Sequence, residues 1–545
     1  MKRYFYYSLL ILLLTACNFK GKEADVVLHN ATIYTANDPQ PFANAIAIKD
    51  NRIIDLGAER DILNGYKAAE YIDCQGQYVF PGFIDAHCHF TRFGLGLSEL
   101  DLVGTKSWEE CLEKVKEHRK KYPNQQWLNG WGWDQNDWEV KEFPNRKELD
   151  KLFPDFPISL TRIDGHAAIV NKTALNLADI TKDSFFEGGE ILKFDNGEPT
   201  GLLIDNAMEY IRELQPEESI EEIKQALLKA QKECFRVGLT SVVDAGLSVR
   251  EVDVIKSMHD SGELKMRVYA MLSPNDEALA RMKEGPYQDD LLSVRSIKLY
   301  GDGALGSRGA LLKKPYHDDH GNSGLMREAP EFYAQWAKYA KHYGFQLNTH
   351  CIGDGANSFI LDLYASNLEG INDLRWRIEH AQVVDPIDMH YFKDYSIIPS
   401  VQPTHATSDM YWAEDRLGVE RMEGAYSYQT LLKENGIIAL GTDFPIESID
   451  PLKTFFAAVF RQDVEGFPEN GFRMEEALNP EETIKGMTLW AALANFEDTL
   501  KGSVEIGKLA DFTVLNADLL NAKKDLMSQV KVTKTIIGGE VVWGN

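Results

Sequence analysis

The sequence is poor in cysteine: 6 occur in 545 residues, and none forms a CxxC pair. A disulfide framework is typical of much shorter chains with paired cysteines, so we exclude one here. The cysteines beyond Cys17 are scattered along the chain, and we expect them to be small core side chains. Cys88 and Cys351 each adjoin a histidine but are predicted to point away from it, because neighbouring strand residues alternate between faces.

Positive charge is also scarce. The chain has 58 lysines and arginines against 84 aspartates and glutamates, which gives a net charge of −26. A surface of this sign repels nucleic acid and cannot form a polybasic membrane patch. We therefore expect no nucleic-acid partner.

Apolar runs long enough to span a membrane are missing as well. The run at residues 4–14 is too short. It follows Lys2 and Arg3 and precedes Leu14-Thr15-Ala16-Cys17, a pattern similar to the bacterial lipoprotein signal. Residues 1–16 are therefore predicted to be a signal peptide, and Cys17 the lipid-bearing N-terminus of an exported protein, anchored on the periplasmic or cell-surface side. The alternative is an ordinary secretory signal with an incidental cysteine.

The sequence does contain a motif of metal-ligating residues, Phe80-Pro81-Gly82-Phe83-Ile84-Asp85-Ala86-His87-Cys88-His89. A Pro-Gly turn leads into an apolar run that ends in two histidines. Residues i and i+2 of a strand share a face, so both imidazoles point the same way. Two converging imidazoles form half of a site for a first-row metal. For this motif alone, a chance pair on a half-buried strand is the alternative.

Eight short apolar runs, each ending in polar or glycine-rich residues, predict strands. Most are separated by enough residues for a helix, such as 330–342 and 449–462. Strands that alternate with helices predict an α/β protein with a (β/α)8 TIM barrel, whose active site lies at the carboxyl ends of the strands. The predicted strands are 82–89, 239–245, 266–272, 296–302, 345–350, 375–380, 396–402 and 437–443.

Polar side chains end several of these runs. Four of the 13 histidines in the chain occupy such positions, which favours one shared site over chance. Because the carboxyl ends of barrel strands meet at one rim, the side chains are expected to converge. They are His87, His89, Lys298, Asp302, His350, His380 and Asp443.

The gap between the first two runs exceeds any ordinary strand-to-helix connection. Residues from about 90 to 237 are therefore expected to form an inserted subdomain that packs over the mouth of the barrel, within a barrel domain at 81–494. Strand-like runs at the two ends of the chain, in 24–80 and 495–545, are expected to meet in one small β-sandwich.

In this order, the motifs resemble the amidohydrolase superfamily, and within it the amidohydrolase-3 branch of YtcJ-like proteins. The resemblance covers nearly all of residues 24–543. Besides the motif ending in His87 and His89, it rests on Lys298-Leu299-Tyr300-Gly301-Asp302-Gly303, Arg377-Ile378-Glu379-His380-Ala381-Gln382, Gly441-Thr442-Asp443-Phe444-Pro445 and Gly507-Lys508-Leu509-Ala510-Asp511-Phe512.

The resemblance implies a centre of two divalent ions, with zinc as the default for mixed nitrogen and oxygen ligands. The histidines of the first strand and Asp443 would hold the more buried ion, and the other two histidines the second. Lys298 would be carboxylated by CO2 and bridge both ions; a salt-bridged lysine beside a single ion is the alternative. The ligand set is His87, His89, Lys298 (carboxylated), His350, His380 and Asp443.

The expected reaction is hydrolysis of a carbon–nitrogen bond, other than a peptide bond, in a small amide-like molecule. Two ions that share a water lower its pKa, and the bridging hydroxide would attack the carbonyl carbon. Asp443 would act as general base and then as general acid.

Four further residues are candidates for substrate binding: Arg308, His166, Trp131 and Gln402. Arg308 could bind an anionic group or be a surface arginine. His166 and Trp131 belong to the insertion, where either Trp131 or Trp133 is expected to be core instead. His405 could contact the substrate, but we favour a structural hydrogen bond for it. We expect Asp302 to support the region around Lys298.

Other functions stay open. A deaminase of the same superfamily would be expected to carry a His-x-x-Glu motif after the fifth strand, where this chain has His350-Cys351-Ile352-Gly353. An esterase would use the same centre. A metal- or solute-binding lipoprotein without catalysis has no need for the lysine and the aspartate. The sequence leaves the substrate and the oligomeric state open, a homodimer being one option.

Overall fold

The computed structural model describes residues 21–123, 125–163, 167–186 and 189–544. Two of the predicted functional residues, Cys17 and His166, lie outside these ranges, as does the predicted signal peptide. Among the helices of the described ranges, none is both long enough and apolar enough to cross a lipid bilayer.

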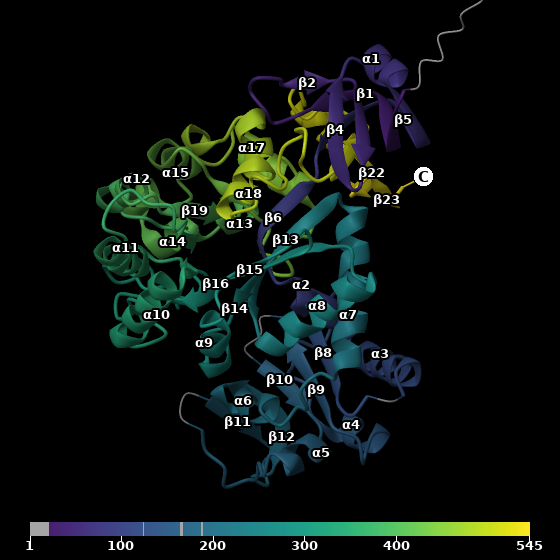
Figure 1. The fold of residues 1–545 in the computed structure, drawn as a ribbon. Coiled ribbons are helices and arrows are strands. Elements are labelled where there is room, and N and C mark those ends of the chain that lie inside the picture. Colours follow the sequence, from purple (N-terminus) through teal and green to yellow (C-terminus); the bar gives the residue numbers. More distant parts are fainter. Residues whose placement is uncertain (1–20, 124, 164–166, 187–188, 545) are drawn as a thin grey trace, which may run out of the picture.

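A nearly closed parallel barrel occupies the centre of the molecule, and the predicted (β/α)8 fold is confirmed (Figure 1). Each strand pairs with the next along the chain, from β6 to β20. β14 is buried along its whole length, as expected for a parallel strand covered on both faces. The barrel strands are β6 (Phe83–Cys88), β13 (Leu239–Leu247), β14 (Arg267–Leu272), β16 (Leu292–Tyr300), β17 (Gln346–Cys351), β18 (Arg377–His380), β19 (Ile398–Val401) and β20 (Ala439–Leu440), with β15 (Tyr287–Gln288) beside β16.

The ring closes where the first barrel strand meets the segment after the last one. The backbone N–H of Asp443 donates to the carbonyl of His87 (2.8 Å). Asp85 accepts from both the backbone N–H and the hydroxyl of Thr442 (3.0 and 2.6 Å). Gly441 permits this approach, since a Cβ there would lie 2.5 Å from the backbone nitrogen of His87. The closure thereby fixes two of the predicted metal ligands relative to each other.

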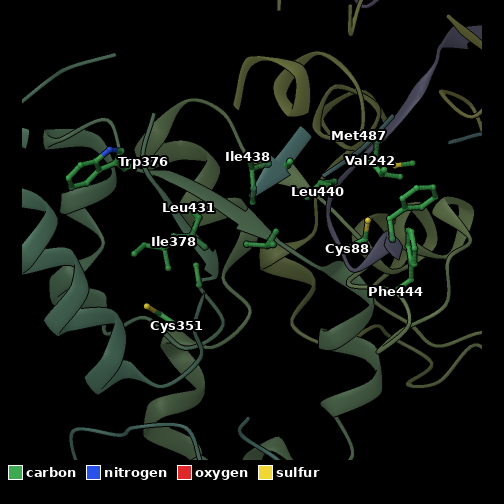
Figure 2. Close-up of a cluster of buried hydrophobic side chains, with 14 of the residues drawn as sticks. Cys88, Val242, Cys351, Trp376, Ile378, Leu431, Ile438, Leu440, Phe444 and Met487 are labelled. Carbon is green, nitrogen blue, oxygen red and sulfur yellow. The ribbon is translucent and has the colours of Figure 1, made fainter. Parts of the chain in front are cut away.

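Helices cover the outside of the barrel, and the main core lies between them and the strands. Figure 2 shows part of this core, in which Cys88 and Cys351 are fully buried among apolar side chains. The prediction that both cysteines are core side chains is confirmed. The helices are α7 (Ile220–Arg236), α8 (Val249–Ser261), α9 (Asp276–Met282), α10 (Pro330–Tyr343), α11 (Asp354–Leu368), α12 (His390–Asp394), α13 (Pro403–Asp409), α14 (Ala413–Leu417), α15 (Tyr428–Asn435), α16 (Pro451–Phe460), α17 (Pro480–Gly486) and α18 (Leu489–Ala494).

The N- and C-terminal segments combine into one mixed sheet of order β23-β22-β21-β5-β1-β3-β4, with β2 paired to β1. Its long strand β5 was not expected, because Gln75 and Gly76 have positive φ and interrupt the alternation of buried and exposed residues. The elements are β1 (Lys22–Tyr34), β2 (Phe42–Ala43), β3 (Ala45–Lys49), β4 (Arg52–Gly57), α1 (Glu59–Gly65), β5 (Tyr66–Pro81), β21 (Phe512–Leu515), β22 (Val532–Ile537) and β23 (Glu540–Trp543).

A buried ion pair joins this sheet to the barrel. Asp511, which precedes β21, accepts two hydrogen bonds from the guanidinium of Arg267 in β14 (2.5 and 2.7 Å). Both side chains are almost fully buried. The Gly507–Phe512 motif of the sequence therefore serves to dock the terminal sheet, away from the rim where the predicted ligands lie.

The segment between β6 and β13 forms a subdomain of its own, with a sheet of order β11-β12-β10-β9-β8-β7. Figure 1 shows it on the side of the barrel opposite the terminal sheet. That it covers the mouth of the barrel stays a prediction. Its elements are α2 (Phe90–Gly96), β7 (Leu100–Asp101), α3 (Trp108–Lys121), β8 (Leu128–Trp133), α4 (Lys147–Leu152), β9 (Ile158–Arg162), β10 (Ala167–Val170), α5 (Lys172–Leu177), β11 (Gly189–Lys193), β12 (Pro199–Asp205) and α6 (Glu209–Arg212).

Candidate metal centre

The side chains predicted as ligands come together at the carboxyl ends of the barrel strands. The imidazole rings of His87 and His380 lie 4.9 Å apart between centroids, and those of His380 and His350 lie 4.5 Å apart. Lys298 extends from β16 to place its Nζ 3.0 Å from Nε2 of His87. Residues from four separate strands thus meet in one buried cluster.

Two of these side chains depend on unusual backbone conformations. His380 has φ 72° and Asp443 has φ 61°, in the left-handed region that non-glycine residues rarely adopt. In a regular strand, Glu379 and His380 would point to opposite faces. The turn at the end of β18 instead lets both approach His87, Glu379 by hydrogen bond and His380 by ring contact.

Three of the histidines are oriented by an acceptor at Nδ1. Nδ1 of His87 contacts Oε2 of Glu379 (2.6 Å), and that of His89 contacts the carbonyl of Ala245 (3.0 Å). In the same way Nδ1 of His380 contacts Oε1 of Gln402 (2.6 Å). An acceptor at Nδ1 places the proton there and leaves the lone pair on Nε2, which is the arrangement found around metal-binding histidines.

Asp443 lies among the Nε2 atoms at distances that fit a shared ion. Its Oδ1 is 3.3 Å from Nε2 of His89 and 3.7 Å from Nε2 of His87. These distances exceed those of a normal N–H···O hydrogen bond. They are close to the separation of about 3.3–3.5 Å between two donors bound tetrahedrally to one zinc ion at ordinary bond lengths. Oδ1 is buried and has no hydrogen-bond partner in the described part of the chain.

The electrostatics of the cluster favour neutral His350 and His380 and an ionised Asp443. Burial lowers the pKa of His350 to about 3, with a further contribution from Lys298, and burial also holds the pKa of His380 well below its ordinary value. Burial alone would raise the pKa of Asp443, but His89 and the other imidazoles around it hold that pKa well below the usual range. Neutral imidazoles and a carboxylate are the protonation states that bind a divalent cation. The donor set therefore fits a metal ion.

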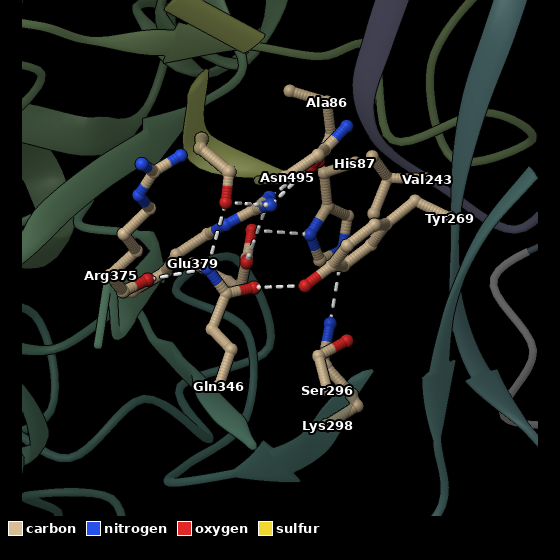
Figure 3. A network of polar contacts seen from close by, with 12 residues as sticks. Ala86, His87, Val243, Tyr269, Ser296, Lys298, Gln346, Arg375, Glu379 and Asn495 are labelled. Atoms are coloured by element: carbon tan, nitrogen blue, oxygen red, sulfur yellow. Dashed lines mark hydrogen bonds and ion pairs between the residues drawn. The ribbon is translucent and has the colours of Figure 1, made fainter. Parts of the chain in front are cut away.

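Glu379 is a buried carboxylate that sequence reasoning missed. Figure 3 shows it between His87 and the polar interior of the barrel. Although burial opposes ionisation, the contact with His87, together with Arg377 and Lys298, lowers the pKa of Glu379 to about 2. Arg377 in turn is held by the carbonyls of Ala86 and Ala494 (3.3 and 2.9 Å). The adjacent Arg-x-Glu-His sequence is a signal for Glu379, but strand alternation predicts that Glu379 points away from the face of His380.

Replacing Glu379 by glutamine is expected to weaken zinc binding by about 10–100-fold, because a neutral amide no longer orients His87 or increases its basicity. Zinc affinity measured by competition with a chelator checks this. Glu369→Gln is the matched control, since Glu369 is exposed at the C-terminal end of α11 and pairs with Lys341. Equal affinities in the two variants would show that Glu379 does not support the metal ligand.

The structure engages two of the predicted substrate-binding residues in other contacts. Arg308 makes a two-pronged salt bridge with Asp318 (2.8 and 3.1 Å), so its charge is compensated. Gln402 orients His380 through Oε1, while its Nε2 is buried without a partner among the described residues. Substrate contacts by either residue stay predictions.

In the insertion, the two tryptophans of β8 differ in burial. Trp133 is fully buried and Trp131 is 43% exposed, so Trp133 is the core residue of the pair. A substrate contact by Trp131 stays a prediction. The remaining candidate in this subdomain, His166, lies outside the described residues.

Asp302 holds the loop that follows β17 rather than Lys298. Its carboxylate accepts from the backbone N–H groups of Ile352, Gly353 and Leu311 (3.0, 2.8 and 2.8 Å). It also lies 3.6 Å from Nε2 of His350. Asp302 therefore supports the site by its contact with His350 and by holding the loop that follows it.

His405, on the first turn of α13, differs from expectation. Its Nε2 is buried and has no hydrogen-bond partner within the described ranges, so the predicted structural hydrogen bond is wrong for this atom. The same Nε2 lies 3.6 Å from Oδ2 of Asp443. Two groups of potential ligands consequently share Asp443: His87 with His89, and His380 with His405.

Comparison with known proteins adds a family match over most of the chain. Residues 70–543 match the sequence profile described as "Amidohydrolase family". The chain is 32% identical to the putative amidohydrolase YtcJ of Bacillus subtilis, over 95% of this chain and 99% of that protein. It is 24% identical to the N-substituted formamide deformylase of Arthrobacter pascens, over 94% and 97%. The crystal structure of an uncharacterized metal-dependent hydrolase from Pyrococcus furiosus superposes with a TM-score of 0.78 at 29% identity, covering 91% of this chain and all of that one.

Proposed function

The chain belongs to the amidohydrolase family, and from this premise we propose that it is a metal-dependent hydrolase that cleaves a carbon–nitrogen bond, other than a peptide bond, in a small molecule. The observation that carries the proposal is the position of Asp443, whose oxygens face imidazole Nε2 atoms at 3.3–3.7 Å. A carboxylate among neutral imidazoles is a ligand set for a divalent ion, and the same carboxylate is a base beside it.

The proposed ligand set is that of the sequence motifs. His87, His89 and Asp443 would hold one ion, and His350 and His380 would take part in holding a second, with zinc as the first candidate. Lys298 would carry a carboxyl group derived from CO2 and lie between the ions. Its Nζ is already 3.0 Å from His87 Nε2, and burial lowers the pKa of Lys298, which favours the neutral amine that reacts with CO2.

The bound ions would supply the acidification of a water molecule and the polarisation of the substrate carbonyl. The protein's part is to move the proton. Asp443 would accept a proton from the attacking water and deliver it to the departing nitrogen, because its carboxylate is ionised and buried at the same rim. Glu379 keeps His87 in the tautomer with Nε2 free, so it acts as a positioning residue.

The deformylase of Arthrobacter pascens supports an amide-type substrate, since its name describes removal of a formyl group from a substituted nitrogen. A deaminase is less favoured, because Gly353 stands where that reaction would call for a glutamate. An esterase would use the same centre and is separated by experiment.

Activity is expected to depend on a divalent metal and to favour amide-type substrates. Protein treated with a chelator and then supplied with zinc would be tested on N-formyl, N-acyl, cyclic-amide, carbamate and ester substrates. The proposal predicts amide hydrolysis that disappears with the metal and returns with zinc. If esters are hydrolysed faster than all of the amide-type substrates, the protein is an esterase and the carbon–nitrogen assignment is wrong. Activity that the chelator does not reduce would contradict the metal dependence.

We also propose that the protein is exported and anchored through a lipid on Cys17, which supports a soluble catalytic body outside the cytoplasm. The support is the sequence pattern around Leu14-Thr15-Ala16-Cys17. Mass spectrometry of the mature N-terminus is expected to find an acylated Cys17, and an unmodified cysteine there would refute the anchor.

A further inference from the structure

We propose that His405 is a metal ligand, which together with His380 and Asp443 binds the second divalent ion of the centre. This inference rests on the proposed function, because it assigns a ligand within the same centre. It goes beyond the sequence motifs, in which the second ion is assigned to His350 and His380. The residue comes from the rim position after β19, which contributes none of the ligands expected from the motifs.

Nε2 of His405 is placed to bind an ion. Nε2 of His405 is buried, lacks a hydrogen-bond partner in the described chain, and lies 3.6 Å from Oδ2 of Asp443. At this distance an N–H would not form a normal hydrogen bond with the carboxylate. A buried polar atom without a partner is costly, and a cation between the two atoms would satisfy both. Two donors bound to one zinc ion are separated by about 3.3–3.5 Å, which is close to the observed distance.

The imidazole of His380 lies beside that of His405. The rings of His380 and His405 are stacked, with centroids 5.8 Å apart and planes at 21°. His380, His405 and Asp443 can each offer an atom such that all three atoms lie within 4.8 Å of one another. This set has the size and the composition of a three-residue zinc site that leaves a position for water or substrate.

Asp443 connects the two groups of potential ligands, His87 with His89 and His380 with His405. Asp443 presents Oδ1 to His89 at 3.3 Å and Oδ2 to His405 at 3.6 Å. Oδ1 therefore faces the imidazoles of His89 and His87, and Oδ2 faces that of His405. An arrangement in which each oxygen of one carboxylate binds a different ion accounts for both contacts, whereas a single ion beside His87 and His89 leaves His405 without a partner.

The position of His405 is fixed by contacts of α13, as a metal ligand requires. His405 lies one helical turn before Asp409 in α13. Asp409 accepts hydrogen bonds from Gln382 and from Tyr426 (3.1 and 2.8 Å). Gln382 follows His380 by two residues, so the same contacts fasten α13 to the end of β18. The spacing of His380 and His405 is thereby fixed by the fold.

His350 is less well placed to be the main partner of His380. Its Nε2 lies 3.5 Å from the carbonyl of Gly303 and 3.6 Å from Oδ1 of Asp302. Both partners belong to the loop after β16, so Nε2 of His350 faces that loop. His350 can add a donor to the second ion, but Nε2 of His405 has no hydrogen-bond partner among the described residues.

The test compares metal binding in the full chain and its variants. Protein saturated with zinc and dialysed is analysed for metal per chain, and zinc affinity is measured by competition with a chelator. We expect two ions in the unaltered protein. His405→Ala should lose one ion, or bind it more weakly by at least the factor of about 10–100 that is typical of losing a supporting residue. His405→Asn, which keeps a polar side chain, should show the same loss.

A spectroscopic readout separates a ligand from a neighbour. In protein loaded with cobalt(II), loss of an imidazole from the ion should change the visible absorption spectrum in His405→Ala. His390→Ala is the matched control, because His390 is exposed, contacts Asp394 and Tyr391, and lies outside the metal cluster. It should keep both ions and the spectrum. Circular dichroism establishes that the variants are folded.

The outcomes distinguish this inference from the proposed function. An unaltered protein that binds no metal would refute both. If His89→Ala loses an ion while His405→Ala and His405→Asn keep two ions, the affinity and the spectrum, then the centre stands and His405 is not a ligand. A raised KM with unchanged metal binding in both His405 variants would also overturn the assignment and place the residue against the substrate.

Discussion

Asp443→Asn is expected to lower kcat by about 10²–10⁴-fold, the range typical of losing a general base. The asparagine side chain has nearly the same shape and retains one oxygen donor, but it cannot accept the proton of the attacking water. The effect should be large because Asp443 is the carboxylate that faces the imidazoles of the centre on both sides. The measurement is steady-state kinetics at saturating zinc, with metal content determined on the same samples, so that lost occupancy is separated from lost proton transfer.

Glu447→Gln provides the control for Asp443→Asn. Glu447 lies four residues further along, in the segment that follows β20, and accepts a hydrogen bond from Ser408 (2.6 Å). The same change from carboxylate to amide at this position is expected to alter kcat by less than about a factor of three, within the small effects usual for surface changes. If the asparagine at 443 retained near-normal turnover with full metal content, the role of Asp443 in proton transfer would be refuted.

Lys298→Met is expected to lower kcat by at least about 10²-fold. Stabilisation of the transition state by metal ions is worth several kcal/mol, and each 1.36 kcal/mol is a factor of ten in rate. Methionine fills the space of the buried stem but cannot be carboxylated. Metal analysis should show a lower zinc content. Protein incubated with isotopically labelled bicarbonate should show a carbamate signal by NMR in the unaltered chain and none in the variant.

Lys534→Met is the control for deletion of a buried lysine, since Lys534 lies in β22 of the terminal sheet, remote from the barrel rim. It should keep full activity, metal and carbamate signal. Unaltered protein that is active and saturated with metal while Lys298 carries no carboxyl group would remove the proposed bridge and leave Lys298 as an unmodified lysine beside His87.

The barrel could be predicted because each strand is an apolar run that ends in polar residues, and the ligands could be found because they end those runs. His87 and His89 follow directly from alternation in β6. His380 and Asp443 were also predicted as the ends of such runs, but their side chains reach the site through left-handed backbone that no local pattern predicts. The sequence thus predicted which residues are candidate ligands better than it predicted where their side chains point.

The roles that sequence reasoning missed, those of Glu379 and His405, depend on contacts between distant parts of the chain. Glu379 meets His87 across 292 positions, and His405 gains its place only because α13 is fastened to the end of β18. The long strand β5 was missed for a different reason, namely the turn at Gln75 and Gly76 in its middle. Long-range pairing and irregular backbone are the two features that composition and periodicity do not encode.

The central claim is that a divalent ion binds between the imidazoles of His87 and His89 and the carboxylate of Asp443. Crystals of the zinc-loaded full chain, measured at the zinc absorption edge, test it most directly. The account predicts an anomalous peak at bonding distance from Nε2 of His87, Nε2 of His89 and an oxygen of Asp443. A zinc-saturated, active protein with no peak within bonding distance of these three atoms would contradict it.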